Sequence, residues 1–393
     1  SVPEATPYAL PEAANAGEVW RVMAEGAREQ IELLHFYGVD KEAGGTALRR
    51  FLDSLAAAAE RGVRVRAVFD AGFARRYPLL PKAIAALPGA EVRLIDAKAH
   101  YGGVQHLKML RVDGREVFIG SQNLDWRALE QIVELGVRTD AACIVEPAGA
   151  VFAVDWALAG GADRGAALAA APAIRAPARC EARVLGPTEA AARAPTPAQG
   201  AGRVALRFGA SPDGWLPGGV AWELPTLLQT IASARERLHL SMLSMHRHDR
   251  DGSDWPVLED ALTAAAERGV QVRVVLGHWS AAKPERMRPL IAFAARHPNL
   301  SVRLLHVPKL HEPPIPFARV LHAKSLAVDG VRAWIGTSNG SKGYFHSSRN
   351  AGVFIEGAAV AGPLQRWLDA LFTRPEALPP DAPPTTGAPT ATH

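Results

Sequence analysis

One spaced motif occurs twice in this chain, and the repeat constrains the fold more than any other feature. Each copy consists of a histidine, a lysine two positions later, an aspartate, a Gly-Ser or Gly-Thr pair and an asparagine. The copies are His106, Lys108, Asp113, Gly120, Ser121, Asn123 and His322, Lys324, Asp329, Gly336, Thr337, Asn339. The identical internal spacing indicates a duplicated unit rather than coincidence. We therefore expect two similar halves that together form one site.

Other segments repeat in the same order. Arg28-Glu29 and residues 57–63 reappear as Arg235-Glu236 and residues 264–270. The separation between the copies is larger at the histidine motif, so the second half has extra residues between Val270 and His322. We expect these near the rim of the site, where loops commonly carry specificity.

The apolar spacing alternates between strand and helix patterns in both halves. Leu48, Phe51, Leu52 and Leu55 recur at helical spacing, and Gly62 ends that helix. The predicted strands are 28–39, 63–70, 91–96, 106–112, 116–119, 135–138, 238–245, 270–276, 301–307, 322–328, 331–335 and 351–355, and the predicted helices are 47–61, 255–268 and 284–297. This alternation predicts an α/β fold with two tandem α/β/α sandwich domains, residues 1–159 and 204–374.

Two stretches lack such patterns. Residues 160–203, rich in Ala, Pro and Arg, are predicted to be a surface linker that is partly helical around 188–193. Residues 375–393, rich in Pro, Thr and Ala, are predicted to be a disordered tail. We expect neither stretch to contribute to the chemistry.

Charge and hydropathy limit the class of protein only weakly. A net charge of +4 and a pI near 9.2 suit a polyanionic substrate or an anionic surface, but do not choose between nucleic acid and lipid. No uninterrupted apolar run reaches the roughly 20 residues of a membrane span. The start at Ser1 fits a secreted or periplasmic chain whose signal peptide has been removed, although a trimmed terminus would look the same. Cys143 and Cys180 could form a disulfide after export, or remain two small reduced residues in a cytosol.

Strand geometry places the motif histidine and lysine together. On a strand, residues two apart point to the same face, so His106 and Lys108 project together while Leu107 and Met109 face the core. Asp113 and Asp329, each followed by glycine, are typical of hairpin turns. We interpret these aspartates as structural residues rather than general bases.

The repeated side chains suit phosphoryl transfer. One imidazole can attack phosphorus and a second can protonate the leaving oxygen. Lys108, Lys324, Asn123 and Asn339 can hold the phosphoryl oxygens by charge and hydrogen bonds. For Ser121 and Thr337 we expect a supporting role in the same site.

These residues resemble the HKD signature of the phospholipase D superfamily. Further resemblance, over residues 15–372, is to the branch of the animal lysosomal five-prime exonucleases and the poxvirus nicking-joining enzyme and envelope phospholipase. It rests on segments 120–136, 315–319 and 336–339 and on Tyr344-Phe345. The resemblance implies two sandwich domains related by a pseudo-twofold axis, with one active site at their interface and no metal or other cofactor. Gly340 departs from the branch, which usually has tryptophan there.

The resemblance also implies roles for single residues. Glu134 is expected to hydrogen-bond the second ring nitrogen of His106, and Asn350 occupies the corresponding position in the second half. On that basis we expect His106 to attack and His322 to act as the acid. His246, His248 and the aspartates near them are interpreted as a solvated loop rather than a metal site.

Several aromatic residues could form the substrate pocket. Phe36, Tyr37, Tyr344 and Phe345 are the predicted substrate-binding residues. Trp126 is expected to pack behind Asn123. Phe317 could either stack on a base or belong to the core.

The sequence therefore predicts a metal-independent phosphodiesterase that forms a phosphohistidine and cuts single-stranded DNA or RNA from the five-prime end. The alternative is a phospholipase D that hydrolyses or exchanges phospholipid head groups. A third possibility is a protein that binds phosphate polymers without turnover, against which the two intact motifs argue. The internal duplication allows a monomer.

Overall fold

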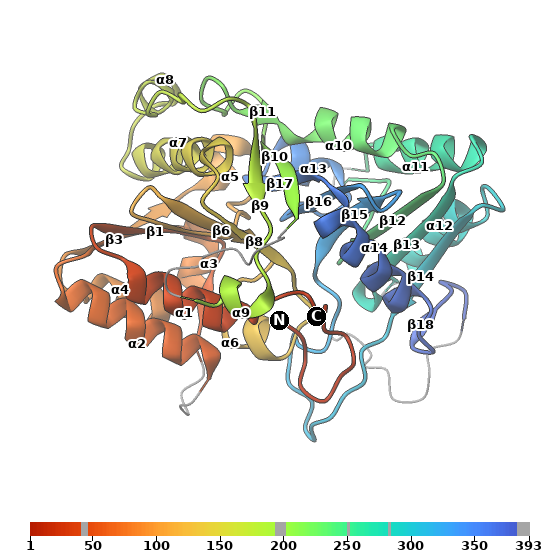
Figure 1. Cartoon of the computed structure of the whole chain (residues 1–393), viewed down its shortest axis with the longest axis horizontal. Coiled ribbons are helices and arrows are strands. Elements are labelled where there is room, and N and C mark those ends of the chain that lie inside the picture. The colour runs from red at the N-terminus through yellow and green to blue at the C-terminus, as the bar shows by residue number, and fades with distance from the viewer. Residues whose placement is uncertain (41–45, 193–201, 250–251, 282–283, 383–393) are drawn as a thin grey trace.

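The computed structural model describes residues 1–40, 46–192, 202–249, 252–281 and 284–382. Figure 1 shows the first half, coloured red to yellow, beside the second half, coloured green to blue. The first half contains a six-stranded sheet in the order β4-β3-β1-β5-β6-β8. Its strands are β1 (Gln30–His35), β3 (Arg64–Asp70), β4 (Ala90–Ile95), β5 (Met109–Val112), β6 (Glu116–Gly120) and β8 (Gly136–Thr139).

The second half contains a larger sheet in the order β11-β10-β17-β16-β15-β12-β13-β14-β18, with β9 paired to β10. Its strands are β9 (Arg179–Arg183), β10 (Arg203–Ser211), β11 (Ala221–Trp222), β12 (Arg237–Met242), β13 (Gln271–Gly277), β14 (Leu300–Leu305), β15 (Lys324–Val328), β16 (Arg332–Gly336), β17 (Asn350–Glu356) and β18 (Ala377–Leu378). The short strands β2 (Gly38–Val39) and β7 (Leu124–Asp125) pair with each other.

The duplication predicted from the motif is confirmed by strand pairing. In the first sheet β1 pairs parallel with β3 and antiparallel with β5. In the second, β12 pairs parallel with β13 and antiparallel with β15. β5 begins directly after Lys108 and β15 begins at Lys324. These two strands therefore occupy the same position in the two sheets.

Helices cover both sheets, as expected for α/β layers (Figure 1). In the first half α1 and α2 pack on one face of the sheet and form a core with it. In the second half α10 and α11 form the matching core. The helices are α1 (Ala16–Gly26), α2 (Ala47–Glu60), α3 (Ala71–Arg76), α4 (Leu79–Ala85), α5 (Ala97–Tyr101), α6 (Trp126–Glu130), α7 (Ala142–Ala159), α8 (Arg164–Ala169), α9 (Pro187–Ala190), α10 (Glu223–Ala232), α11 (Val257–Glu267), α12 (Pro284–Ala294), α13 (Lys342–His346) and α14 (Ala358–Phe372), with a 3-10 turn at His278–Ala281.

A third core joins the two halves. It contains residues of α7 from the first half, of α14 from the second and of both sheets, so the halves share one continuous apolar interior. Within the described residues, α7 is the one helix whose length and hydropathy would suit a membrane span, but 67% of it is buried inside the protein. It is therefore a core helix.

The stretch predicted to be a linker is more ordered than expected. It contains α8, α9 and β9, and β9 extends the second sheet by pairing with β10. β9 does alternate, with Cys180 and Ala182 less exposed than the charged residues between them, but this five-residue strand was missed within a segment rich in Ala, Pro and Arg. Cys143 and Cys180 form a disulfide, with Cα atoms 5.8 Å apart, that ties α7 to β9.

The predicted tail also begins later than expected. β18 pairs antiparallel with β14, so Ala377 and Leu378 belong to the sheet. The remainder of that prediction, residues 383–393, lies outside the described residues.

Candidate active site

The two histidine motifs meet where the halves touch. The residue before each histidine forms a parallel bridge with the opposite half, Gln105 with Arg349 and Val133 with Leu321. The backbone N–H of His106 donates to the carbonyl of Arg349, and that of His322 to the carbonyl of Val133, both at 2.9 Å. These bridges place the two histidines in one interface, as the sequence predicts.

Because of these bridges, the side chain that contacts each histidine comes from the opposite half. Glu134, which follows Val133, places both carboxylate oxygens 2.9 Å from Nδ1 of His322. Asn350, which follows Arg349, places Oδ1 2.9 Å from Nδ1 of His106. The predicted contact between Glu134 and His106 is therefore wrong. Glu134 follows His106 at the same spacing at which Asn350 follows His322, but the backbone bridges select the contacts between the halves.

The hydrogen bonds of Asn350 determine the tautomer of His106. Nδ2 of Asn350 donates to the carbonyl of Tyr344 at 2.8 Å, and its Oδ1 accepts from Oγ1 of Thr337 at 2.8 Å. Oδ1 is thus the atom that faces His106. Because an amide oxygen only accepts, Nδ1 of His106 carries the proton and Nε2 keeps a free lone pair.

The two lysines are fully enclosed beside the histidines. Lys108 donates to the carbonyl of His106, and Lys324 to the carbonyl of His322. They are 1% and 0% exposed. Burial lowers the pKa of Lys324 to about 7. Burial, together with the charge of Lys324, lowers the pKa of Lys108 well below its usual value.

The same environment keeps His106 neutral. Burial and then the charges of Lys108 and Lys324 hold the pKa of His106 well below its usual value. A neutral imidazole with Nδ1 protonated is the form that can act as a nucleophile through Nε2.

Glu134 and His322 differ from His106, because a proton between them can reside either on the carboxylate of Glu134 or on Nδ1 of His322. Burial raises the pKa of Glu134 to about 7, and burial followed by the two lysines lowers the pKa of His322. Either the ion pair or the neutral pair of acid and imidazole still carries a proton on Nε2 of His322. The pair can therefore hold a transferable proton without net charge, which costs less desolvation free energy than an isolated imidazolium.

The motif asparagines carry unused hydrogen-bonding capacity. Asn123 and Asn339 are 6% and 1% exposed, and Oδ1 of each has no hydrogen-bond partner among the described residues. Buried amide groups are usually paired, so these two amides are suited to a ligand, with Oδ1 free to accept a hydrogen bond and Nδ2 as the group that could donate to a phosphoryl oxygen. Nδ2 of Asn123 donates to the hydroxyl of Tyr37 at 3.3 Å.

Ser121 and Thr337 lie directly behind the reacting groups. Thr337 donates to Asn350, as described above, and accepts from the backbone N–H of Ala351 at 3.1 Å. Ser121 exchanges hydrogen bonds with the backbone of Leu135, at 3.0 and 3.1 Å. These contacts position the strands that carry Asn350 and Glu134.

Aromatic side chains surround His106. The rings of Phe36 and Tyr344 have centroids 5.2 and 5.0 Å from the imidazole, both edge-on. Nζ of Lys108 lies 5.3 Å from the centre of the Phe36 ring. Phe36 and Tyr344 therefore lie where the sequence predicts a substrate wall.

Phe345 does not belong to this wall. It is 0% exposed and stacks on Trp255 within the core of the second half, with ring centroids 5.7 Å apart. Tyr344 and Phe345 are neighbours on the short helix α13, so only one of them can face the site. The prediction of Phe345 as a substrate-binding residue is wrong for this reason.

The two motif aspartates are structural, as predicted. Asp113 accepts hydrogen bonds from the backbone N–H groups of Arg28, Glu29 and Gln30. Asp329 accepts the corresponding hydrogen bonds in the second half, from residues 235–237. Although burial raises the pKa of Asp113, these backbone hydrogen bonds lower it overall. The aspartates hold the hairpin turns against the preceding strands.

Gly340 leaves no room for the tryptophan usual in the resembling branch. A Cβ atom at this position would lie 2.7 Å from Cγ of Met245 and 3.1 Å from Sδ of Met242. The two methionines thus occupy the space beside Gly340, and the wall of the second half is shaped by them.

No group of three or more potential metal ligands occurs among the described residues. His248 lies 3.8 Å from Asp254 at an exposed position. His246 is largely enclosed, and burial lowers its pKa to about 4, so its environment is less solvated than predicted.

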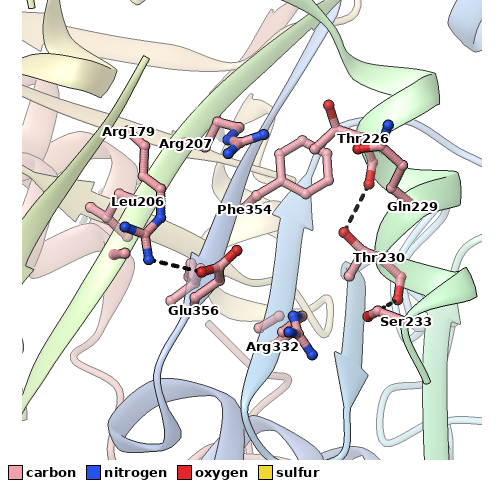
Figure 2. Close-up of a pocket in the computed structure, with 13 residues that line it drawn as sticks. Arg179, Leu206, Arg207, Thr226, Gln229, Thr230, Ser233, Arg332, Phe354 and Glu356 are labelled. Atoms are coloured by element: carbon pink, nitrogen blue, oxygen red, sulfur yellow. Dashed lines mark hydrogen bonds and ion pairs between the residues drawn. The ribbon is translucent and has the colours of Figure 1, made fainter. Parts of the chain in front are cut away.

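A separate cavity of about 150 Å³ lies between α10 and the ends of β10, β16 and β17 (Figure 2). Figure 2 shows Arg179 paired with Glu356 at 2.9 Å on its rim. On the neighbouring strands β16 and β17, the backbone of Arg332 lies opposite Glu356. The motif residue Gly336, four residues further along β16, lies opposite Gly352. The cavity contains none of the predicted site residues and is not part of the active site.

Sequence reasoning missed one residue that organises the interface. Arg349 is 0% exposed, and its guanidinium pairs with Asp155 of α7 at 2.9 Å. It also donates to the carbonyls of Ser211 and Trp215. The only signal in the sequence is an arginine next to Asn350, which does not distinguish a buried clamp from a surface residue.

Comparisons with known proteins agree with this architecture. A family model described as "Cardiolipin synthase, PLD-like domain" matches residues 22–156 and 227–372. The 5'-3' exonuclease PLD3 of Rattus norvegicus is 29% identical, with 95% of this chain and 77% of the relative covered. The 5'-3' exonuclease PLD4 of Homo sapiens is 30% identical, covering 95% and 76%. The structure of phosphatidylserine synthase from Haemophilus influenzae shares the fold, with a TM-score of 0.61 at 13% identity over 93% of this chain and 86% of that one.

Proposed function

Because this chain belongs to the phospholipase D superfamily, we propose that it is a metal-independent phosphodiesterase that cuts single-stranded nucleic acid from the five-prime end through a phosphohistidine. The observation that carries the proposal is the crossed pair of imidazoles. Nδ1 of one imidazole contacts Asn350 and Nδ1 of the other contacts Glu134, and both imidazoles lie in one buried interface with two lysines.

In the first step His106 is the nucleophile. Its Nε2 lone pair attacks phosphorus, and the bond from phosphorus to the leaving oxygen breaks. This attack requires a neutral imidazole with its proton on Nδ1. Burial keeps His106 neutral, and the contact with Asn350 keeps the proton on Nδ1. This assignment agrees with the expectation from the sequence, but its physical reason is the amide rather than the carboxylate.

His322 supplies the proton to the leaving oxygen. The Glu134–His322 pair holds that proton on Nε2 and becomes anionic after donating it. In the second step the same pair takes a proton from water, the resulting hydroxide attacks phosphorus, and the bond between phosphorus and His106 breaks. The Glu134–His322 pair thus loses a proton in the first step and regains one in the second step.

Lys108, Lys324, Asn123 and Asn339 surround the phosphoryl oxygens. Their ammonium charges and amide hydrogen bonds stabilise the charge that develops in the transition state. These groups supply the stabilisation that metal ions provide in other phosphodiesterases.

Two observations support nucleic acid as the substrate. The relatives named above are 5'-3' exonucleases, at 29% and 30% identity. Phe36 and Tyr344 place aromatic edges beside the nucleophile, where an unpaired base can pack. Since repeated removal from a five-prime hydroxyl end requires each cut to leave a new five-prime hydroxyl, the bond between phosphorus and O5′ is the one that breaks.

We also propose that the protein is exported and acts as a monomer. The disulfide between Cys143 and Cys180 suits an oxidising compartment. Both imidazoles and their partners come from one chain, so the site needs no second copy.

The test is a substrate panel with protein treated with EDTA. Labelled single-stranded oligonucleotides with a five-prime hydroxyl are compared with duplexes, with five-prime phosphorylated strands and with phosphatidylcholine vesicles. We expect stepwise shortening of the free single strand, poor cutting of the other nucleic acids and no choline release. Choline release without oligonucleotide shortening would establish the phospholipase alternative, and loss of all activity with EDTA, restored by a divalent cation, would refute the mechanism.

A further inference from the structure

The segment that precedes the second motif presents an exposed aromatic ring. Phe317 is 53% exposed and lies between β14 and His322, in the region where the second half is longer than the first. Large apolar side chains with this exposure are few among the described residues. The segment that carries it reaches the first half, because the backbone N–H of Arg319 donates to the carbonyl of Gln131 at 2.8 Å.

The ring is fixed in place although it is exposed. The guanidinium of Arg127, from the first half, lies 5.9 Å from the ring centre, and Trp279 meets the ring edge-on at 6.4 Å. Arg127 also donates to the carbonyl of Pro316 at 3.0 Å. Phe317 has a φ of 56°, a left-handed conformation that is unfavourable for a bulky residue. Such strain persists where surrounding contacts enforce it, and it is common at ligand clamps.

A chain of contacts connects this ring to a motif asparagine. Arg127 pairs with Asp125 at 2.6 Å, and Asp125 accepts from the hydroxyl of Tyr37 at 3.2 Å. That hydroxyl accepts in turn from Nδ2 of Asn123 at 3.3 Å. Asp125 is 0% exposed, so one buried carboxylate anchors both the support of the ring and the catalytic amide. These contacts hold the ring of Phe317 and the amide of Asn123 in a fixed relative position.

We propose that Phe317, held by Arg127 and Trp279, is a stacking platform for one nucleobase of a single-stranded substrate. This inference rests on the proposed nuclease function and adds a subsite to it. A base has a flat π-face that matches a single exposed ring, and arginine beside the ring strengthens such stacking. The surroundings include the Arg127–Asp125 ion pair, which does not suit the wide apolar contact that a lipid surface would need.

The experiment compares Phe317→Leu with Phe317→Tyr. Leucine keeps the apolar volume but removes the π-face, whereas tyrosine keeps the ring. For single-stranded oligonucleotides of six to ten bases we expect kcat/KM to fall roughly 10- to 100-fold in Phe317→Leu, mainly through KM, and to change little in Phe317→Tyr. Bis-p-nitrophenyl phosphate has no base to stack and should be hydrolysed equally by both variants and the wild type.

A second arm locates the stacked base. An abasic site is moved along the oligonucleotide. At the position of the stacked base, it should lower kcat/KM of the wild type by the same factor as Phe317→Leu does, and it should not lower kcat/KM of Phe317→Leu further. Wild-type kinetics for Phe317→Leu on every oligonucleotide would refute the platform while leaving the nuclease proposal intact. Failure of the wild type to shorten any oligonucleotide, with bis-p-nitrophenyl phosphate still hydrolysed, would refute the nuclease proposal and the platform with it. Matching thermal unfolding curves confirm that the variants are folded.

Discussion

Glu134 in the first half and His322 in the second are 188 residues apart in sequence, yet both carboxylate oxygens lie 2.9 Å from Nδ1 of the imidazole. The corresponding contact of His106 is with Asn350, at 2.9 Å. Each histidine is therefore oriented by the other half, and neither half can form a complete site alone. The difference between a carboxylate and an amide also leaves Nε2 of His106 with a free lone pair and Nε2 of His322 with a proton.

This difference predicts unequal effects of removing each histidine. His106→Ala and His322→Ala should each lower kcat on oligonucleotides at least about 10⁴-fold, because they act in sequence on one phosphorus. His322→Ala should still release about one equivalent of p-nitrophenol from p-nitrophenyl esters, whose leaving group needs no proton, and then stall at the phosphohistidine because the base for water is missing. His106→Ala should release none. Steady-state kinetics on oligonucleotides and rapid-mixing measurement of the p-nitrophenol burst check this, and a burst in His106→Ala but not in His322→Ala would make His322 the nucleophile.

Removing the charge of Glu134 should affect the acid step selectively. Glu134→Gln keeps a hydrogen-bond acceptor for Nδ1 of His322 but no longer stabilises a second proton on the ring. We expect kcat on oligonucleotides to fall roughly 10²- to 10³-fold, within the usual contribution of general acid catalysis, while the first release of p-nitrophenol from p-nitrophenyl esters keeps its rate, because that leaving group needs no proton. Glu267→Gln, at an exposed helical position, is the matched control. An equal loss in oligonucleotide cleavage and in the rate of the p-nitrophenol burst would assign Glu134 to folding or binding instead.

The pKa shifts predict an acidic pH optimum. Burial lowers the pKa of Lys324 to about 7, so this lysine is charged below pH 7 and loses its charge above it. His106 has a pKa well below its usual value and stays neutral in mildly acidic solution. The profile of kcat/KM should therefore stay high between about pH 5 and 6.5 and fall above about pH 7. Unfolding curves over the same range exclude denaturation, and activity that rises from pH 7 to 9 would contradict the assignment.

The disulfide should contribute to stability without taking part in catalysis. Cys143 and Cys180 close a loop with a sequence separation of 37 residues, which corresponds to roughly 3–4 kcal/mol of unfolded-state entropy. Cys143→Ser/Cys180→Ser should unfold several degrees lower than the wild type and keep its kcat at 25 °C. Thermal unfolding with and without reductant tests the expectation. Identical midpoints would show that the bond is absent or without effect.

The buried pair between Arg349 and Asp155 should be essential for assembly of the halves. Arg349→Met leaves the Asp155 carboxylate buried without its partner and should destabilise the protein by roughly 3–5 kcal/mol. Adding Asp155→Leu removes the unpaired charge and should recover part of that loss. Urea unfolding of the three proteins measures this, and a double variant less stable than Arg349→Met would contradict the explanation.

The sequence by itself identified the repeated residues that meet where the halves touch, and the plan of each half. The repeated motif identified both histidines and both lysines, because their spacing survives duplication. Strand alternation placed Leu107 and Met109 in the core, where both are fully buried, although the regular strand β5 begins at Met109 and not at His106 as predicted. The aspartate–glycine turns were also predictable, since the conformation they require is local.

Only the tertiary structure decided which half supplies the side chain that contacts Nδ1 of each histidine. The spacing from His106 to Glu134 equals that from His322 to Asn350, so local geometry cannot distinguish a contact within a half from one between halves. The distinction comes from the parallel bridges of Gln105 with Arg349 and Val133 with Leu321, which form only when the halves associate. For the same reason adjacent Tyr344 and Phe345, equally aromatic in the sequence, separate into a site residue and a core residue, because burial depends on the packing of residues distant in the chain.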